Sequence, residues 1–275
     1  MQNAPGNYQL PPAAQQRLQD LAQHAASGHT TALTDFSVDE LILIEDAGFT
    51  SLGMVMGSSI YHIGFQIGKW GNQELQVLTS AMYQARELAM NRMRMEAAAL
   101  QADGVVSVSL RITYHSWSPH TAEFTCIGTA VRHAQDGNDW KSTDGGPFTS
   151  HVSGQSLWKL VKSGYRPVGM VLGNCVYHIA YQGALQLMKQ TGQNMENPTF
   201  TQAIYDAREL AMGRMQSEAE RLGADLVVES SITPSNHTWE SHILEYFALG
   251  TAAKAIPGAV KNLSPSLVVN ANAVM

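Results

Sequence analysis

The chain has 275 residues, of which 44% are hydrophobic and 15% charged, and its formal net charge is −6. This composition supplies apolar material for about two folded domains and has too little charge for a disordered chain. The acidic balance argues against nucleic acid as a partner, because phosphate binding needs a basic surface. No run reaches the roughly 18–20 apolar residues that a membrane span requires.

The first 34 residues form an N-terminal extension, in which residues 11–26 are compatible with a short helix. Its opening segment, MQNAPGNYQLPPAAQQ, lacks the basic stretch followed by an apolar one that marks a secretory signal. The two cysteines, Cys126 and Cys175, do not occupy equivalent repeat positions, so they predict no disulfide framework. Both observations favour a cytoplasmic protein.

The first folded unit is predicted over residues 35–133 and opens with a short helix at 35–47. Ser37 is the expected N-cap of this helix and Glu40 its capping-box partner, while Gly48 is a C-terminal stop. A cap at one end and a glycine at the other are typical of a helix of about three turns.

The rest of the first unit is predicted to follow the order strand, helix, strand, strand. The first strand is rich in Val, Ile and Tyr and is expected to bend at Gly57, and the long helix has apolar residues at helical spacing. These elements are predicted over residues 52–65, 74–100, 105–114 and 122–132. Such a βαββ unit places one long helix on a small antiparallel sheet.

The second half of the chain repeats the first. GFTSLGMVMGSSIYHIGFQ at 48–66 returns as GYRPVGMVLGNCVYHIAYQ at 164–182, and YQARELAMNRM at 83–93 returns as YDARELAMGRM at 205–215. The first pair is 116 positions apart and the second 122, so the second copy holds six extra residues, which fall in the loop-like TGQNMENP segment. Fused copies of one unit are typical of pseudo-symmetric pairs or ring assemblies.

The repeat also sets the remaining boundaries. We predict a linker rich in Asp, Gly, Asn and Pro at 134–150, the second unit at 151–256 and a C-terminal tail at 257–275. The elements of the second unit are predicted over residues 153–163, 168–181, 200–222, 226–233 and 243–254. The predicted fold class is α+β: two tandem βαββ units, each preceded by a short helix. A three-stranded sheet with one helix leaves an edge exposed, which a ring of neighbours would cover.

Several short motifs resemble one known family. In the first copy they are Ala85-Arg86-Glu87-Leu88-Ala89, Arg92-Met93, Ala102-Asp103-Gly104-Val105-Val106 and Gly128-Thr129-Ala130-Val131. In the second copy they are Ala207-Arg208-Glu209-Leu210-Ala211, Arg214-Met215, Leu222-Gly223-Ala224-Asp225, Val227-Val228 and Gly250-Thr251-Ala252. Over 48–133 and 164–256 the chain is therefore similar to the YbjQ-like family, whose domain is described as "putative heavy-metal-binding".

The resemblance implies a dodecin-like βαββ fold and self-assembly into a pentameric ring, without an established catalytic activity. With two units in each chain, five chains would give ten units, a pseudo-decameric arrangement of two stacked rings or a single ring of mixed units. The short helices at 37–47 and 153–163 and the tandem fusion depart from the single-domain members of the family.

Histidines in the two hairpins are the first candidates for a metal site. Both hairpins contain the pattern His-x-Trp-x-x-His, followed by a glutamate at a matching position. The candidate ligands are His115, His120 and Glu123 in the first copy and His237, His242 and Glu245 in the second. Imidazole with carboxylate suits a divalent metal such as zinc, nickel or copper. The alternative is that these are polar hairpin residues around a tryptophan anchor.

His62 and His178 form a second candidate pair, each in a Tyr-His-Ile segment of the first strand. Strand alternation places each histidine on the face opposite the flanking Tyr and Ile. One reading is a buried histidine bonded to a backbone group. The other is a ring of histidines at a subunit seam that binds metal or senses pH.

Two Arg-Glu pairs recur on the long helices, at 86–87 and 208–209. They are compatible with a catalytic acid and its partner, but more readily with ion pairs within or between subunits, each contributing under about 1 kcal/mol when exposed.

The primary functional hypothesis is therefore a non-enzymatic ring protein. Divalent metal binding through the hairpin histidines is the second hypothesis, and small-molecule binding or catalysis at subunit interfaces is the third.

Overall fold

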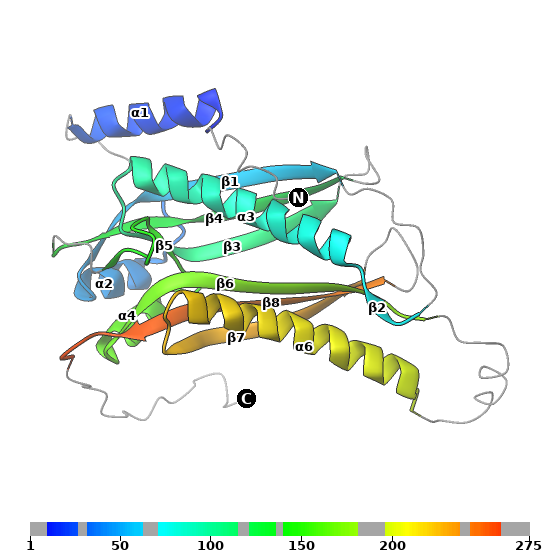
Figure 1. Cartoon of the computed structure of the whole chain (residues 1–275). Coiled ribbons are helices and arrows are strands. Elements are labelled where there is room, and N and C mark those ends of the chain that lie inside the picture. The colour runs from blue at the N-terminus through cyan, green and yellow to red at the C-terminus, as the bar shows by residue number, and fades with distance from the viewer. Residues whose placement is uncertain are drawn as a thin grey trace, which may run out of the picture.

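The protein is described by a computed structural model that covers residues 10–26, 32–62, 71–114, 121–135, 140–180, 196–236 and 243–259 (Figure 1). Within these ranges the chain forms two tandem units of mixed α+β architecture, which we call unit 1 and unit 2. In Figure 1 the two long helices, α3 (Gln76–Ala99) and α6 (Pro198–Arg221), run side by side, each across its own sheet. The α+β fold with duplicated units is confirmed.

Unit 1 follows an N-terminal helix, α1 (Pro12–Ala26). Besides α3, its elements are α2 (Val38–Asp46), β1 (Phe49–His62), β3 (Gly104–Tyr114) and β4 (Thr121–His133). Unit 2 repeats them around α6 as α4 (Gly154–Lys162), β6 (Tyr165–His178), β7 (Leu226–Asn236) and β8 (Ile243–Ala255). The three long strands of each unit pair antiparallel, in the orders β1-β4-β3 and β6-β8-β7.

The first strand differs from its predicted form in two ways. It begins at Phe49 rather than at residue 52, because Gly48 has a φ of 88° that ends the turn after α2, and the chain becomes extended at once. It has no β-bulge at Gly57, since its pairing with β4 continues in register through that residue. The irregularity in register lies earlier, between Ser51 and Gly53.

Two strands of two residues each were not predicted, because so short a segment carries no periodic signal. β5 (Phe148–Thr149) lies in the segment predicted as linker and pairs parallel with β3. β2 (Gln73–Glu74) precedes α3 in unit 1, yet it pairs antiparallel with β6 in unit 2. Each sheet therefore has four strands, in the orders β1-β4-β3-β5 and β2-β6-β8-β7, and β2 joins the sheet of the other unit.

The short helices form a second contact between the units. The predicted capping box is confirmed, with Ser37 Oγ accepting from the Glu40 backbone and the Glu40 carboxylate accepting from the Ser37 N–H. Glu40 also accepts a hydrogen bond from Gly154 N at 3.0 Å, at the start of α4. At the C-terminal end of α2, Trp158 Nε1 of α4 donates to Asp46 Oδ2 at 2.7 Å. One carboxylate therefore caps α2 and joins it to α4.

Helix α3 lies between the sheets of the two units. One core contains Met82 of α3, Phe124 of β4, and Leu172 and Val176 of β6. A second core lies on the other face of the unit 2 sheet, where α6 packs. The layers are therefore the unit 1 sheet, α3, the unit 2 sheet and α6. Among the described residues, no helix is long and apolar enough to cross a membrane.

Candidate functional site

The predicted metal ligands fall only partly within the structure. His115, His120, His237 and His242 lie outside the described residues. Within the described ranges, no group of three or more His, Cys, Asp or Glu side chains is arranged to hold a metal ion. The hairpin metal site therefore stays a prediction.

The second pair of histidines occupies different environments in the two units. His178 is 4% exposed and its Nδ1 lies 2.9 Å from the carbonyl oxygen of Gly71. His62, at the equivalent end of β1, is exposed. The difference follows from the arrangement of the units, because the segment before α3 covers the end of β6 and the described chain places no such segment over the end of β1.

Glu245 takes part in an ion pair that joins the two units. Its Oε1 accepts from Arg86 Nη2 at 2.7 Å, and both side chains are 1% exposed. The Arg86 guanidinium lies over the ring of Phe247 at 4.3 Å and near that of Phe124 at 5.6 Å. Arg86 of α3 therefore forms an ion pair within the chain, as the sequence favoured, but its partner is Glu245 on a strand of unit 2. The exposed pair that was expected on α6 does form, with Arg208 Nη2 2.9 Å from Glu209 Oε1.

The pair is a positioning feature of the interface. Arg86 Nε and Nη1 are buried without a hydrogen-bond partner, so the guanidinium depends on Glu245 and on the aromatic rings. A buried ion pair adds little net stability, but removing one partner is strongly unfavourable. The geometry therefore selects one docking of α3 on the unit 2 sheet.

The edge of β6 is capped by polar groups of α3. Val176 N donates to Thr79 Oγ1 at 3.0 Å, and Asn174 Nδ2 donates to the Thr79 carbonyl at 3.1 Å. Leu75 N donates to the Val176 carbonyl at 2.8 Å. Because a bare sheet edge exposes N–H and C=O groups, these contacts remove an association surface from unit 2.

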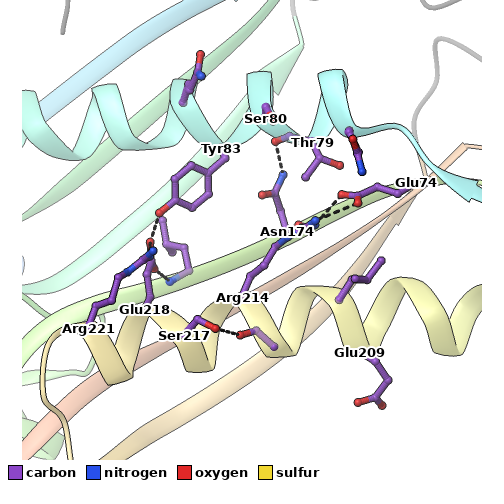
Figure 2. Close-up of a pocket in the computed structure, with 15 residues that line it drawn as sticks. Glu74, Thr79, Ser80, Tyr83, Asn174, Glu209, Arg214, Ser217, Glu218 and Arg221 are labelled. Carbon is purple, nitrogen blue, oxygen red and sulfur yellow. Dashed lines mark hydrogen bonds and ion pairs between the residues drawn. The ribbon is translucent and has the colours of Figure 1, made fainter. Parts of the chain in front are cut away.

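Glu218 of α6 joins the same edge to α3. Its carboxylate accepts from Leu172 N at 2.5 Å and from the Tyr83 hydroxyl, which points from α3 toward it (Figure 2). Burial, followed by the hydrogen bond to Glu218, raises the pKa of Tyr83 and keeps it a neutral donor. Arg214 donates to the Asn174 carbonyl at 2.7 Å.

A cavity of about 710 Å³ lies between α3 and α6 (Figure 2). Its lining mixes charged groups, such as Glu74 and Arg214, with Asn174, whose buried Oδ1 has no hydrogen-bond partner. Arg214 and Glu74 pair with each other at 2.7 Å. Two buried oxygens of the described lining, Glu74 Oε1 and Asn174 Oδ1, have no hydrogen-bond partner, and Glu74 is held by its ion pair with Arg214.

Unit 1 repeats these edge contacts on β1, where α3 takes the part of α6 and α1 takes the part of α3. Glu96 accepts from Met56 N at 2.9 Å, as Glu218 does from Leu172, and Arg92 Nη1 donates to the Ser58 carbonyl at 2.5 Å. In the place that Tyr83 holds on Glu218, Glu96 binds Arg17 of α1. These residues escaped the sequence prediction, although the spacing of the repeat places Glu96 and Glu218 at equivalent positions.

Glu87 gives the interface a dependence on pH. Burial, followed by the charge of Glu218, raises the pKa of Glu87 above its ordinary value of 4.5, while Arg94 and Arg221 oppose the shift. The folded state therefore binds the proton more tightly than the unfolded state, and this group lowers stability as pH rises through its folded pKa.

We accordingly expect Glu87→Gln to unfold at higher urea concentration than the wild type at pH 7. The gain disappears near pH 4, where the wild-type carboxyl is protonated in both states. Parallel urea titrations at the two pH values measure the difference, and an equal gain at both would contradict the assignment.

Comparison with known proteins places these features in a family. The chain is 46% identical over 261 residues to the "Encapsulin nanocompartment protein Rv1762c" of Mycobacterium tuberculosis, covering 94% of this chain and 97% of that protein. It is 34% identical over 91 residues to a UPF0145 protein of Thermosipho melanesiensis, covering 32% of this chain and 81% of the relative. A UPF0145 protein of Halorubrum lacusprofundi is 39% identical over 88 residues, which cover 30% and 83%. The family model described as "Putative heavy-metal-binding" matches residues 47–134 and 164–256. The chain therefore belongs to this YbjQ family and holds two tandem copies of its domain.

Proposed function

We propose that the protein is a non-enzymatic assembly module, whose dodecin-like units close into a ring of five chains. One observation carries the proposal: the two units do not cover their equivalent surfaces equally. The unit 2 sheet is covered by α3 on one face and α6 on the other. On the unit 1 sheet, Met56 and Ile60 remain 45% and 60% exposed on the face away from α3.

The relatives support a role in assembly. The mycobacterial protein is named for an encapsulin nanocompartment and aligns over nearly the whole of both chains. We extend that association to this chain and infer that it works in the cytoplasm as part of, or bound to, a protein shell. Both of its cysteines are free thiols, as a reducing compartment allows.

The mass of the purified protein tests the proposal. Light scattering after size exclusion, together with native mass spectrometry, is expected to give five times the chain mass of 29.9 kDa. A single 29.9 kDa species at micromolar concentration would remove the proposal, and another closed multiple would correct its stoichiometry.

Metal binding is the second candidate. The histidine pattern recurs in both hairpins, and the family model carries the description "Putative heavy-metal-binding". Glu123 is the candidate carboxylate of the first copy, and Glu245 of the second copy would have to exchange its ion pair with Arg86 for the metal. Calorimetry with zinc, nickel and copper is expected to show stoichiometric binding that His115→Ala with His120→Ala reduces. Absence of heat with all three metals would retire this candidate.

A small-molecule role is supported only by the cavity between α3 and α6, where the buried Asn174 amide oxygen could accept a hydrogen bond from a ligand. A compound retained through purification and released on denaturation, seen by mass spectrometry, is the expected sign. Its loss in Asn174→Leu would place it there.

A further inference from the structure

We propose that a second copy of the chain docks its α6 on β1 and β4 of unit 1, with Arg208 of one chain pairing with Glu123 of the next. This inference rests on the proposed self-assembly and gives its contacts. It repeats between chains the interface that α3 forms with unit 2 inside one chain.

The helix side of this interface is present twice. Tyr83 and Arg86 of α3 correspond to Tyr205 and Arg208 of α6 by the 122-residue spacing of the repeat. Arg86 is 1% exposed against unit 2, whereas the Arg208 side chain is 37% exposed and lies over the Tyr205 ring at 4.4 Å. Tyr205 itself is 50% exposed. Helix α6 thus presents to solvent an arginine and a tyrosine whose equivalents on α3 are buried and half-buried.

The sheet side is also present twice. Glu245 corresponds to Glu123, and both follow the hairpin at the same point of the third strand. Leu172 and Val176, which are 1% and 0% exposed beside Glu245, correspond to Met56 and Ile60, which are exposed. Glu123 is half-buried and accepts a hydrogen bond from Thr125 Oγ1 at 3.5 Å. An arginine arriving here meets a carboxylate whose cross-strand neighbour is Ile60, while Thr125 stands at the position equivalent to Phe247, the ring under Arg86.

The backbone edges agree with this pairing. β6 has β2 as its outer neighbour, whereas β1 is the outermost strand of its sheet among the described residues. Thr201 of α6 corresponds to Thr79, whose hydroxyl accepts from Val176 N, so Thr201 of the incoming chain would accept from Ile60 N. Glu196 likewise corresponds to Glu74, the partner of Arg214, and would meet Arg92.

The short helices give independent support. Gly154 and Trp158 of α4 contact α2 within the chain and correspond to Val38 and Ile42 of α2 by the 116-residue spacing. Val38 and Ile42 are 74% and 62% exposed. If the contact recurs between chains, the α4 of a neighbour covers them. Exposed apolar patches of this kind mark association surfaces.

One contact must change when the neighbour docks. Arg17 of α1 holds Glu96 where Tyr83 holds Glu218, so Tyr205 of the incoming chain takes that place and displaces Arg17. The two surfaces are different, which makes the contact heterologous, and a heterologous contact gives a ring when its rotation closes.

Charge reversal tests the pairing. Arg208→Glu and Glu123→Arg are each expected to weaken self-association by at least about 100-fold, since each places like charges together. The double variant restores opposite charges at every interface and is expected to recover the wild-type mass. Glu220→Arg is the matched control on α6, because Ala98, its equivalent on α3, is exposed and lies outside the interface.

Light scattering over a dilution series measures the mass of all four variants, and circular dichroism verifies that each is folded. If the wild type is a monomer, the proposed function itself fails. If the wild type assembles but neither single reversal changes the mass, or the double variant does not recover it, the Arg208–Glu123 contact is wrong while assembly stands. Arg17→Ala is expected to associate at least as tightly as the wild type, and a 10-fold weakening would overturn the displacement of α1.

Discussion

Glu245→Gln lowers the free energy of unfolding by about 3–5 kcal/mol, because it leaves the buried Arg86 guanidinium without its counter-charge. Both side chains are 1% exposed, so water does not replace the lost carboxylate. The measurement is urea unfolding at one fixed protein concentration, since self-association would shift the midpoint with dilution.

Two further variants separate the charge from the packing. Glu220→Gln changes an exposed glutamate on α6 and is expected to stay within about 0.5 kcal/mol of the wild type. Arg86→Met combined with Glu245→Leu removes both charges at similar volume. This double variant should lower the free energy of unfolding by less than Glu245→Gln alone. A loss below about 1 kcal/mol for Glu245→Gln would mean that the pair does not hold the units together.

Gly173→Ala is expected to destabilise the protein by about 3 kcal/mol, because α6 crosses β6 with no room for a side chain. A Cβ on Gly173 would lie 2.0 Å from the Ala211 carbonyl oxygen and 2.7 Å from Met215 N. Both are helix backbone atoms, so α6 as a whole must move away from the sheet. Gly57 has the same role against α3, where a Cβ would lie 2.1 Å from the Ala89 carbonyl oxygen.

Gly213→Ala is the matched control for this prediction. Gly213 is on the same helix, and a Cβ there would meet nothing within 4 Å. Alanine favours the helix by roughly 0.5–1 kcal/mol over glycine, so this variant should gain stability. In both thermal and urea unfolding, the midpoint is expected to fall for Gly173→Ala and to rise for Gly213→Ala. A tolerated Gly173→Ala would show that the helix and sheet are further apart than described.

The long elements could be predicted because their signals are local. The Ser37–Glu40 box and the apolar spacing of α3 are properties of short segments. In the second copy the apolar spacing recurs on α6, while α4 keeps the serine cap, Ser153, without the glutamate. β2 and β5 carry no such signal, since two residues in extended form are decided by what lies beside them.

The partners at the interface are harder to predict for the same reason. Arg86 and Glu245 are 159 residues apart, and the residue types alone suggested a helix ion pair for one and a metal ligand for the other. What decides their pairing is the docking of α3 on the unit 2 sheet, which no local pattern records. The hairpin histidines lie outside the described residues, so their role stays a prediction.

The placement of α3 between two sheets has a consequence for how relatives with one unit compare with this chain. The matched UPF0145 proteins have room for a single unit, so each such contact there would join separate polypeptides. In the proposed assembly, one contact of every two lies within a single chain, so an encounter between chains is replaced there by an intramolecular step at high effective concentration. A closed ring built from whole chains can therefore contain only an even number of units. Equivalent positions of the two units can also diverge, since one set forms the contact within a chain and the other would form it between chains.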